Sequence, residues 1–138
     1  MIEKFNNIFL LIIYFVHFLG IGIYAFQTIV DTKKFMKKFG IDNSGAIMIR
    51  LAGAFMLAVF LMSIYVGFVR PGGLDNTWAF FNLVFLNNLC VFLCNFYSIK
   101  IDKTGVNKKT GVEPIFAPLA FAIMSAILCY GLADKIYV

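Results

Sequence analysis

Charged residues are scarce in this sequence. Only 14% of its 138 residues are Asp, Glu, Lys or Arg, whereas 62% are hydrophobic, and the mean hydropathy is +0.89. A soluble domain has about 25% charged and roughly 45–50% apolar residues, and one this small leaves about a third of its unfolded-chain surface exposed after folding. A disordered chain needs low hydrophobicity and high charge. The composition therefore excludes both classes and indicates an integral membrane protein.

Residues that carry chemistry are also few. The chain has seven acidic residues, one histidine and three cysteines. All seven acidic residues lie outside the long apolar runs or near their ends, which excludes a carboxylate-driven proton path through the membrane. We find no nucleotide-binding loop, metal-ligand cluster or Ser-His-Asp arrangement. We therefore expect no catalytic residues, no metal site, no required cofactor and no enzymatic activity.

The three cysteines give no sign of a disulfide framework. Cys90, Cys94 and Cys129 all lie within apolar runs, and their odd number argues against complete pairing. Cys90 and Cys94 are one helical turn apart, but a metal site needs more ligands than these two. We expect all three to be small buried side chains.

Four apolar runs cover most of the chain, at about 6–29, 46–69, 78–99 and 114–133. Each is close to the roughly 20 residues that a helix needs to cross a bilayer. The runs do not alternate polar and apolar residues as barrel strands do. The first run also exceeds the 7–15 apolar residues of a secretory signal, so we expect it to remain as a span. The sequence predicts an all-α protein with a single membrane domain over 1–138, folded as an antiparallel four-transmembrane-helix bundle.

Lysines gather in two of the three connections. Connection 30–45 and connection 100–113 each contain four lysines, whereas the connection between the second and third runs contains one basic residue, Arg70. In a four-span chain the first and third connections share a side. The positive-inside rule then predicts that both lie on the cytoplasmic or equivalent side, with both termini opposite. The net charge of +5 thus reports topology, and we expect no nucleic-acid partner, since no basic reading module is present.

The first connection also has an amphipathic pattern. In a short helix, Phe35, Met36 and Phe39 would lie on one side, flanked by four lysines, Lys33, Lys34, Lys37 and Lys38. This spacing is typical of an interfacial helix with rings at the acyl boundary and ammonium groups among phosphates. The four lysines are therefore candidates for contacts with anionic lipid headgroups. The alternative is a junction whose lysines only fix orientation.

Polar residues inside the first and third runs are candidates for ligand binding, because such residues are costly in lipid. In the first run, Tyr14, His17 and Tyr24 share one stripe of a helix. That stripe suits a pigment, a quinone, a haem iron or a proton relay. In the third run, Asn88 and Asn95 share a face, and Asn87 lies on its edge. The alternative for both groups is hydrogen bonding to neighbouring helices.

Arg50 opens the second run, close to the first lysine-rich connection. Its guanidinium either reaches out to that surface along its flexible stem or faces inward and holds a carboxylate or phosphate with two hydrogen bonds. No acidic residue lies in the interior to pair with it. The outward position is therefore the one that we expect.

The entrance to the second run resembles a known class. Phe39-Gly40-Ile41, a short polar spacer and the stretch from Arg50 to Leu57 with its Arg-x-x-Gly-Ala pattern resemble small four-helix membrane proteins of the DoxX-like class. The likeness covers the first half of the chain. It implies the four-helix layout and little about activity.

Three functions are compatible with these patterns. The first is a non-catalytic accessory or structural subunit that packs laterally in a larger membrane complex, with lipids and other membrane subunits as partners. The second is a binder or carrier of a small apolar molecule (a lipid, quinone or pigment) between the first and third spans. The third is a membrane oxidoreductase subunit that uses His17 or the cysteines. Stripes of small residues and the small connections favour the first.

Overall fold

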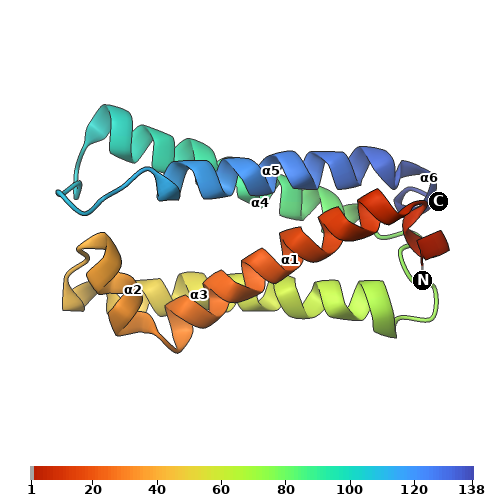
Figure 1. The fold of residues 1–138 in the computed structure, drawn as a ribbon, viewed down its shortest axis with the longest axis horizontal. Helices are drawn as coiled ribbons and strands as arrows, with labels where there is room; N and C mark the ends of the chain where they lie inside the picture. The colour runs from red at the N-terminus through yellow and green to blue at the C-terminus, as the bar shows by residue number, and fades with distance from the viewer. Residues whose placement is uncertain (1) are drawn as a thin grey trace.

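The structure, a computed structural model, describes residues 2–138 and is built from helices (Figure 1). Four are long, and they are α1 (Ile8–Ile29), α3 (Ala46–Ile64), α4 (Trp78–Phe96) and α5 (Glu113–Gly131). Two are short, α2 (Thr32–Phe39) and α6 (Ala133–Ile136). No strand occurs in the described residues. The predicted all-α fold is confirmed.

Two of the long helices extend beyond their α-helical parts. α3 and α4 continue as π-helical turns, Tyr65–Val69 and Tyr97–Asp102, and 3-10 turns cover Ile2–Phe5 and Asn43–Gly45. The stretches long and apolar enough to cross a membrane are then Ile8–Ile29, Asn43–Val69, Trp78–Asp102 and Glu113–Gly131. They coincide with the four predicted runs to within three residues at each end. The chain is therefore an integral multi-pass membrane protein.

Two polar side chains cap helix starts, and a glycine ends α2. The Asn7 side chain accepts a hydrogen bond from the Leu10 amide at 2.9 Å at the start of α1, as expected of an N-cap. Asp42 accepts from the Ser44 amide at 2.9 Å before α3, which holds the pKa of its carboxyl below the usual range. Gly40 ends α2 in the left-handed conformation at φ 66°, where a side chain would be strained.

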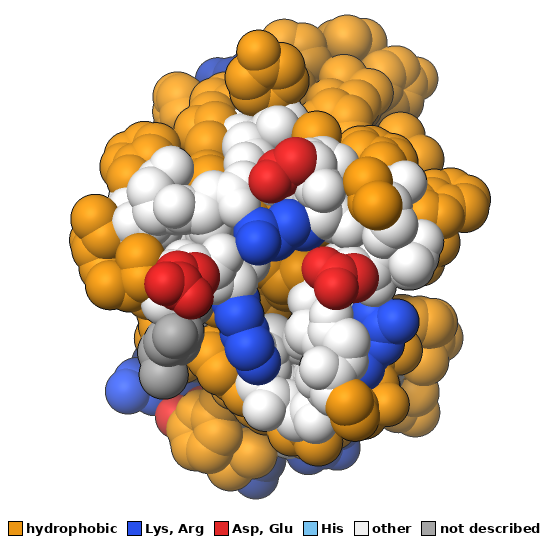
Figure 2. All heavy atoms as spheres, turned by 90° about the vertical axis from the view of Figure 1, so that its right-hand side faces the viewer, with side chains coloured by type: hydrophobic (Ala, Val, Ile, Leu, Met, Phe, Trp, Pro, Cys, Tyr) orange, Lys and Arg blue, Asp and Glu red, His pale blue; other side chains and the backbone are white. Residues whose placement is uncertain are grey.

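The four long helices form two antiparallel pairs. α1 lies along α3, and α4 lies along α5, and α1 crosses toward α5 near the chain termini (Figure 1). Both lysine-rich connections lie at one end of the bundle, which we call the lysine-rich end. Both termini lie at the other, the terminal end, where Figure 2 shows acidic and basic side chains intermingled. The two connections lie at the same end of the bundle, as the four-span order predicts.

Small residues let the paired helices approach closely. A Cβ placed on Gly53 of α3 would overlap the Thr28 hydroxyl of α1, and one on Gly67 would lie 2.9 Å from the Tyr14 hydroxyl. Small residues at helix contacts are a common way to bring backbones together in membranes. The α1–α3 pair therefore depends on glycine at these two positions.

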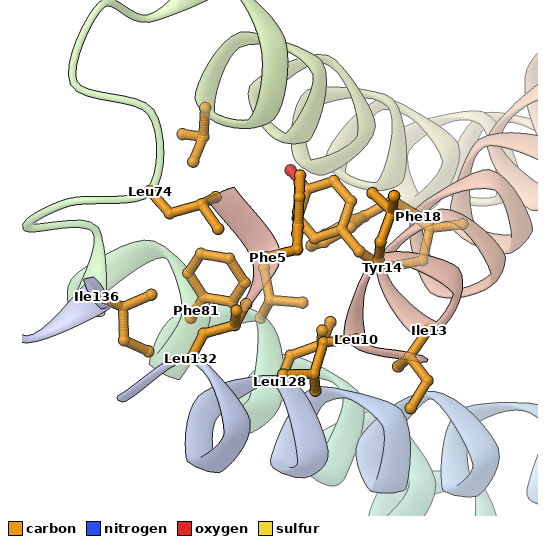
Figure 3. Close-up of a cluster of buried hydrophobic side chains, with 14 residues drawn as sticks. Phe5, Leu10, Ile13, Tyr14, Phe18, Leu74, Phe81, Leu128, Leu132 and Ile136 are labelled. Atoms are coloured by element: carbon orange, nitrogen blue, oxygen red, sulfur yellow. The ribbon is translucent and has the colours of Figure 1, made fainter. Parts of the chain in front are cut away.

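The packed core lies toward the terminal end (Figure 3). Side chains from the chain start, from the 70–77 turn and from α1, α4, α5 and α6 meet there, including Phe5, Leu10, Tyr14, Phe18, Leu74, Phe81, Leu128, Leu132 and Ile136. At the lysine-rich end the two helix pairs leave a cavity between them. The bundle is thus filled at one end and hollow at the other.

The amphipathic helix predicted in the first connection is present as α2, but its apolar side faces the protein. Met36 and Phe39 are only 2% and 9% exposed, and Phe35 is half-buried. The prediction that these side chains face the acyl boundary is therefore wrong for Met36 and Phe39. The physical reason is that α2 covers apolar surface at the hollow end of the bundle, where Phe35 and Phe39 line the cavity.

Candidate functional site

The candidate site is a cavity of about 770 Å³ between the two helix pairs, at the lysine-rich end. All helices except α6 contribute to its wall, through residues that include Ile21, Tyr24, Thr28, Phe35, Phe39, Ala52, Met56, Val59, Asn87, Asn88, Val91, Asn95, Glu113, Ala117, Pro118 and Phe121. Most of these side chains are apolar, with a few amides and hydroxyls between them. Volumes of roughly 300–1,000 Å³ with this mixture are typical of small-molecule sites.

Three polar side chains from three helices meet at the inner end of the cavity. The Asn88 amide nitrogen (Nδ2) on α4 lies 2.9 Å from Ser125 Oγ on α5 and 3.1 Å from His17 Nε2 on α1. Ser125 Oγ is 2.8 Å from the same His17 nitrogen, and its hydroxyl donates to the Phe121 carbonyl at 2.8 Å. All three side chains are buried. This polar cluster joins α1 to the α4–α5 pair.

His17 lies behind the cavity wall. Its ring is fully buried, and the second ring nitrogen, Nδ1, has no hydrogen-bond partner within residues 2–138. The rings of Phe18 and Phe121 pack edge-on against it, with centroids 4.5 and 5.6 Å away. His17 therefore orients Asn88 and Ser125, whereas Asn88 presents the polar cluster to the cavity.

A second polar group stands at the mouth of the cavity. The Tyr24 hydroxyl donates to Glu113 Oε1 at 2.7 Å, and Lys38 Nζ lies 2.6 Å from the other oxygen of that carboxylate. The Asn107 amide donates to the Gly40 carbonyl at 3.0 Å. These contacts tie α1 and α2 to the start of α5 and to the loop before it, so they hold the two helix pairs together at the open end.

Asn95 has a structural partner on the cavity wall. Its amide donates to the Pro114 carbonyl at 2.7 Å. Pro118 lies four residues further along α5 and has no amide hydrogen to give to that carbonyl. Asn95 therefore replaces the hydrogen bond that the helix loses at its internal proline.

The other candidates from the sequence lie in different surroundings. Tyr14 belongs to the core and donates to the Ser63 carbonyl at 2.6 Å. Arg50 is exposed and donates to the Thr32 hydroxyl at 3.2 Å. Asn87 is exposed to the cavity. The four lysines of α2, Lys33, Lys34, Lys37 and Lys38, are all exposed. The structure thus brings Tyr24, Asn87, Asn88 and Asn95 together on one cavity, with His17 behind it.

The cysteines differ from expectation. Cys90 and Cys94 are exposed, and only Cys129 is half-buried. The prediction that all three are buried is wrong for the first two, because the inward face of α4 is taken by Phe81, Val84 and Asn88.

Three polar residues of the site had no clear signal in the sequence. Ser125 is part of a stripe of small residues on α5, which indicates only close packing. Glu113 and Asn107 lie in or beside a connection, where polar residues are ordinary. The missing information was which helices pair, since that decides which polar residues face each other.

No group of three or more His, Cys, Asp or Glu side chains is placed to hold a metal ion in the part of the chain that the structure describes. No family model, curated protein or solved structure matches this chain. The resemblance to the DoxX-like class therefore stays a prediction.

Proposed function

We propose that this protein binds a small, predominantly apolar molecule in the cavity between the α1–α3 and α4–α5 pairs. The observation that supports the proposal is the cavity of about 770 Å³, lined by apolar side chains with Asn87 and Asn88 at its inner end and Tyr24 and Glu113 at its mouth. Where a hollow of this size is empty, the side chains that line it lack dispersion contacts on one side. An apolar occupant would restore them.

The polar contacts around the cavity also support a binding role. The polar cluster of His17, Asn88 and Ser125 fixes the inner end, and the Tyr24–Glu113–Lys38 contacts fix the mouth. A preformed site loses less conformational freedom on binding than one that has to assemble. The arrangement therefore supports a role as a binding protein or carrier. The alternative function is that of an accessory subunit, which would bind other membrane proteins within a larger membrane complex. Measuring whether the purified chain carries a small molecule distinguishes the two functions.

We propose that the lysine-rich end faces the cytoplasm or its equivalent, and that both termini face the opposite side. Single cysteines introduced at Lys34 and Lys108, in a chain whose three native cysteines are changed to serine, should react with an impermeant thiol reagent from the cytoplasmic side only. A cysteine at Asp75 should react from the other side. Labelling of Lys34 and Lys108 from opposite sides would refute this orientation.

We further propose that Lys33, Lys34 and Lys37, which are exposed on α2, contact anionic lipid headgroups, whereas Lys38 pairs with Glu113. Each lysine near an anionic membrane surface contributes about 1 kcal/mol.

A matched pair of substitutions on α5 tests the binding function. Ala117 lines the cavity, whereas Ala120 is exposed and lies outside the cavity wall. Ala117→Phe should fill part of the hollow and lower the amount of co-purified small molecule at least about fivefold, since overlapping an occupant costs about 1–3 kcal/mol. Ala120→Phe should leave it unchanged. Native mass spectrometry and organic extraction of the protein, purified in mild detergent, measure the bound molecule.

Two results would overturn the proposal. One is equal occupancy in wild type and Ala117→Phe. The other is a chain that carries no small molecule and migrates only within a large assembly of other membrane proteins, which would favour the accessory-subunit function instead.

A further inference from the structure

The inner end of the cavity has a hydrogen-bond acceptor without a partner. The nitrogen of the Asn88 carboxamide is engaged with Ser125 and His17. Its oxygen (Oδ1) accepts no hydrogen bond from residues 2–138, and it does not belong to the fully buried atoms. Because Asn88 is only 6% exposed and lines the cavity, this oxygen faces the cavity.

The neighbouring residue adds the complementary group. Asn87 is exposed and also lines the cavity, and its side chain makes no hydrogen bond within the described part of the chain. A carboxamide has two donor hydrogens and an acceptor oxygen. The inner end therefore presents an acceptor on Asn88 and both donors and an acceptor on Asn87.

The two amides lie deep in the membrane-spanning part of α4, so a polar group of the ligand has to match their hydrogen-bonding atoms. Both lie near the middle of the span Trp78–Asp102, where lipid offers no alternative partner. A polar group that enters this region without a hydrogen bond pays a large desolvation cost. A hydroxyl group is both donor and acceptor, so it is able to donate to Asn88 and to accept from Asn87. A ketone, ester or quinone carbonyl only accepts, and it leaves the Asn88 oxygen without a partner.

We propose that the ligand of this cavity is an apolar molecule with a hydroxyl group, which hydrogen-bonds to Asn88 and Asn87 at the inner end. This inference rests on the proposed function, because it names the class of molecule that the same cavity takes. The walls between the amides and the mouth, which include Met56, Val59 and Val91, enclose the hydrocarbon part of the molecule.

The experiment compares two probes on the full chain in phospholipid nanodiscs. One is a hexadecanol that carries a photoreactive diazirine in mid-chain and an alkyne tag, and the other is its methyl ether, which accepts but does not donate. In the wild type, the alcohol should label peptides of the cavity wall about fivefold more than the ether at equal membrane concentration, as expected for one neutral hydrogen bond. Equal labelling by the two probes would overturn the hydroxyl proposal and leave the apolar-ligand function standing. Absence of labelling on the cavity wall by either probe would overturn both.

Two variants on α4 test whether Asn88 causes the preference for the alcohol over the ether. Asn88→Leu should lower the ratio of alcohol to ether labelling to about one, because the acceptor is lost. Asn82→Leu is the matched control, since Asn82 accepts from Tyr137 at the terminal end and lies outside the cavity wall, and it should keep the wild-type ratio. A folded Asn88→Leu variant that keeps the fivefold ratio would contradict the proposal. If that variant does not fold, the comparison of the two probes on the wild type still decides it.

Discussion

The three polar residues on one stripe of α1 have three different surroundings. Tyr14 donates to a backbone carbonyl of α3 within the core, His17 meets Asn88 and Ser125, and Tyr24 donates to a carboxylate at the mouth of the cavity. Their spacing predicts a shared face, and they do share it. Their roles depend on which helix lies opposite each turn, which the spacing does not contain.

Tyr14 provides a test of the structural role at this scale. Tyr14→Phe keeps the ring in the core and removes the hydrogen bond to the Ser63 carbonyl. We expect the free energy of unfolding in detergent to fall by about 1 kcal/mol. Titration with a denaturing detergent, followed by circular dichroism, measures the change.

Tyr137→Phe is the matched control for this substitution. The Tyr137 hydroxyl donates to Asn82 at 3.0 Å in an exposed position, so its loss should change stability by less than about 0.5 kcal/mol. Equal effects of the two substitutions would contradict a buried structural bond at Tyr14.

At the scale of elements, the sequence predicts the helices well and their pairing poorly. The bilayer requires each long apolar run to be a helix, because lipid offers no partner to an open backbone. This is why the four spans could be predicted. The pairing of α1 with α3 and of α4 with α5 could not, because each helix is apolar around most of its circumference and so gives no stripe that indicates its neighbour.

The α4–α5 pair offers a test of coupling between elements. Asn95 donates to the Pro114 carbonyl, which Pro118 leaves without an intrahelical donor. Asn95→Leu should therefore destabilise the protein by about 1 kcal/mol, because it leaves that carbonyl unpaired. In a Pro118→Ala background the restored amide supplies the donor, and the same change should cost much less.

A double-mutant cycle measures this coupling by detergent-induced unfolding of the four proteins. We expect an interaction energy of about 0.5–1 kcal/mol between positions 95 and 118. Strictly additive effects would show that Asn95 does not serve the proline-interrupted turn of α5.

At the scale of the whole molecule, the bundle is filled at its terminal end and hollow at its lysine-rich end. The four-span order predicts that the two lysine-rich connections lie at the same end, and they do (Figure 1). The polar residues of the first and third runs, Tyr14, His17, Tyr24, Asn87, Asn88 and Asn95, predict a site between the first and third spans, and of these the cavity wall includes Tyr24, Asn87, Asn88 and Asn95. The hollow itself could not be predicted, since it depends on how the two helix pairs lie relative to each other, which the residue spacing within one helix does not contain.

This asymmetry predicts different costs for shortening side chains at the two ends. Leu128 is fully buried in the core, whereas Val91 is 40% exposed and lines the cavity. In a membrane, moving an apolar side chain from lipid into the protein interior changes its free energy little. The destabilisation caused by shortening such a side chain therefore comes from the packing contacts that are lost. Leu128→Ala should therefore lower the unfolding free energy by about 2 kcal/mol. Val91→Ala, in protein stripped of bound lipid, should lower it by less than about 0.5 kcal/mol, because few packing contacts are lost.

The comparison becomes sharper when an occupant is present. With an apolar molecule in the cavity, Val91 gains packing contacts, so Val91→Ala should then cost more, whereas the cost of Leu128→Ala should not change. Thermal unfolding of both variants before and after lipid extraction measures this difference. Equal costs at Val91 and Leu128 in the extracted protein would mean that the lysine-rich end is as closely packed as the core, and the cavity would lose its support as a binding site.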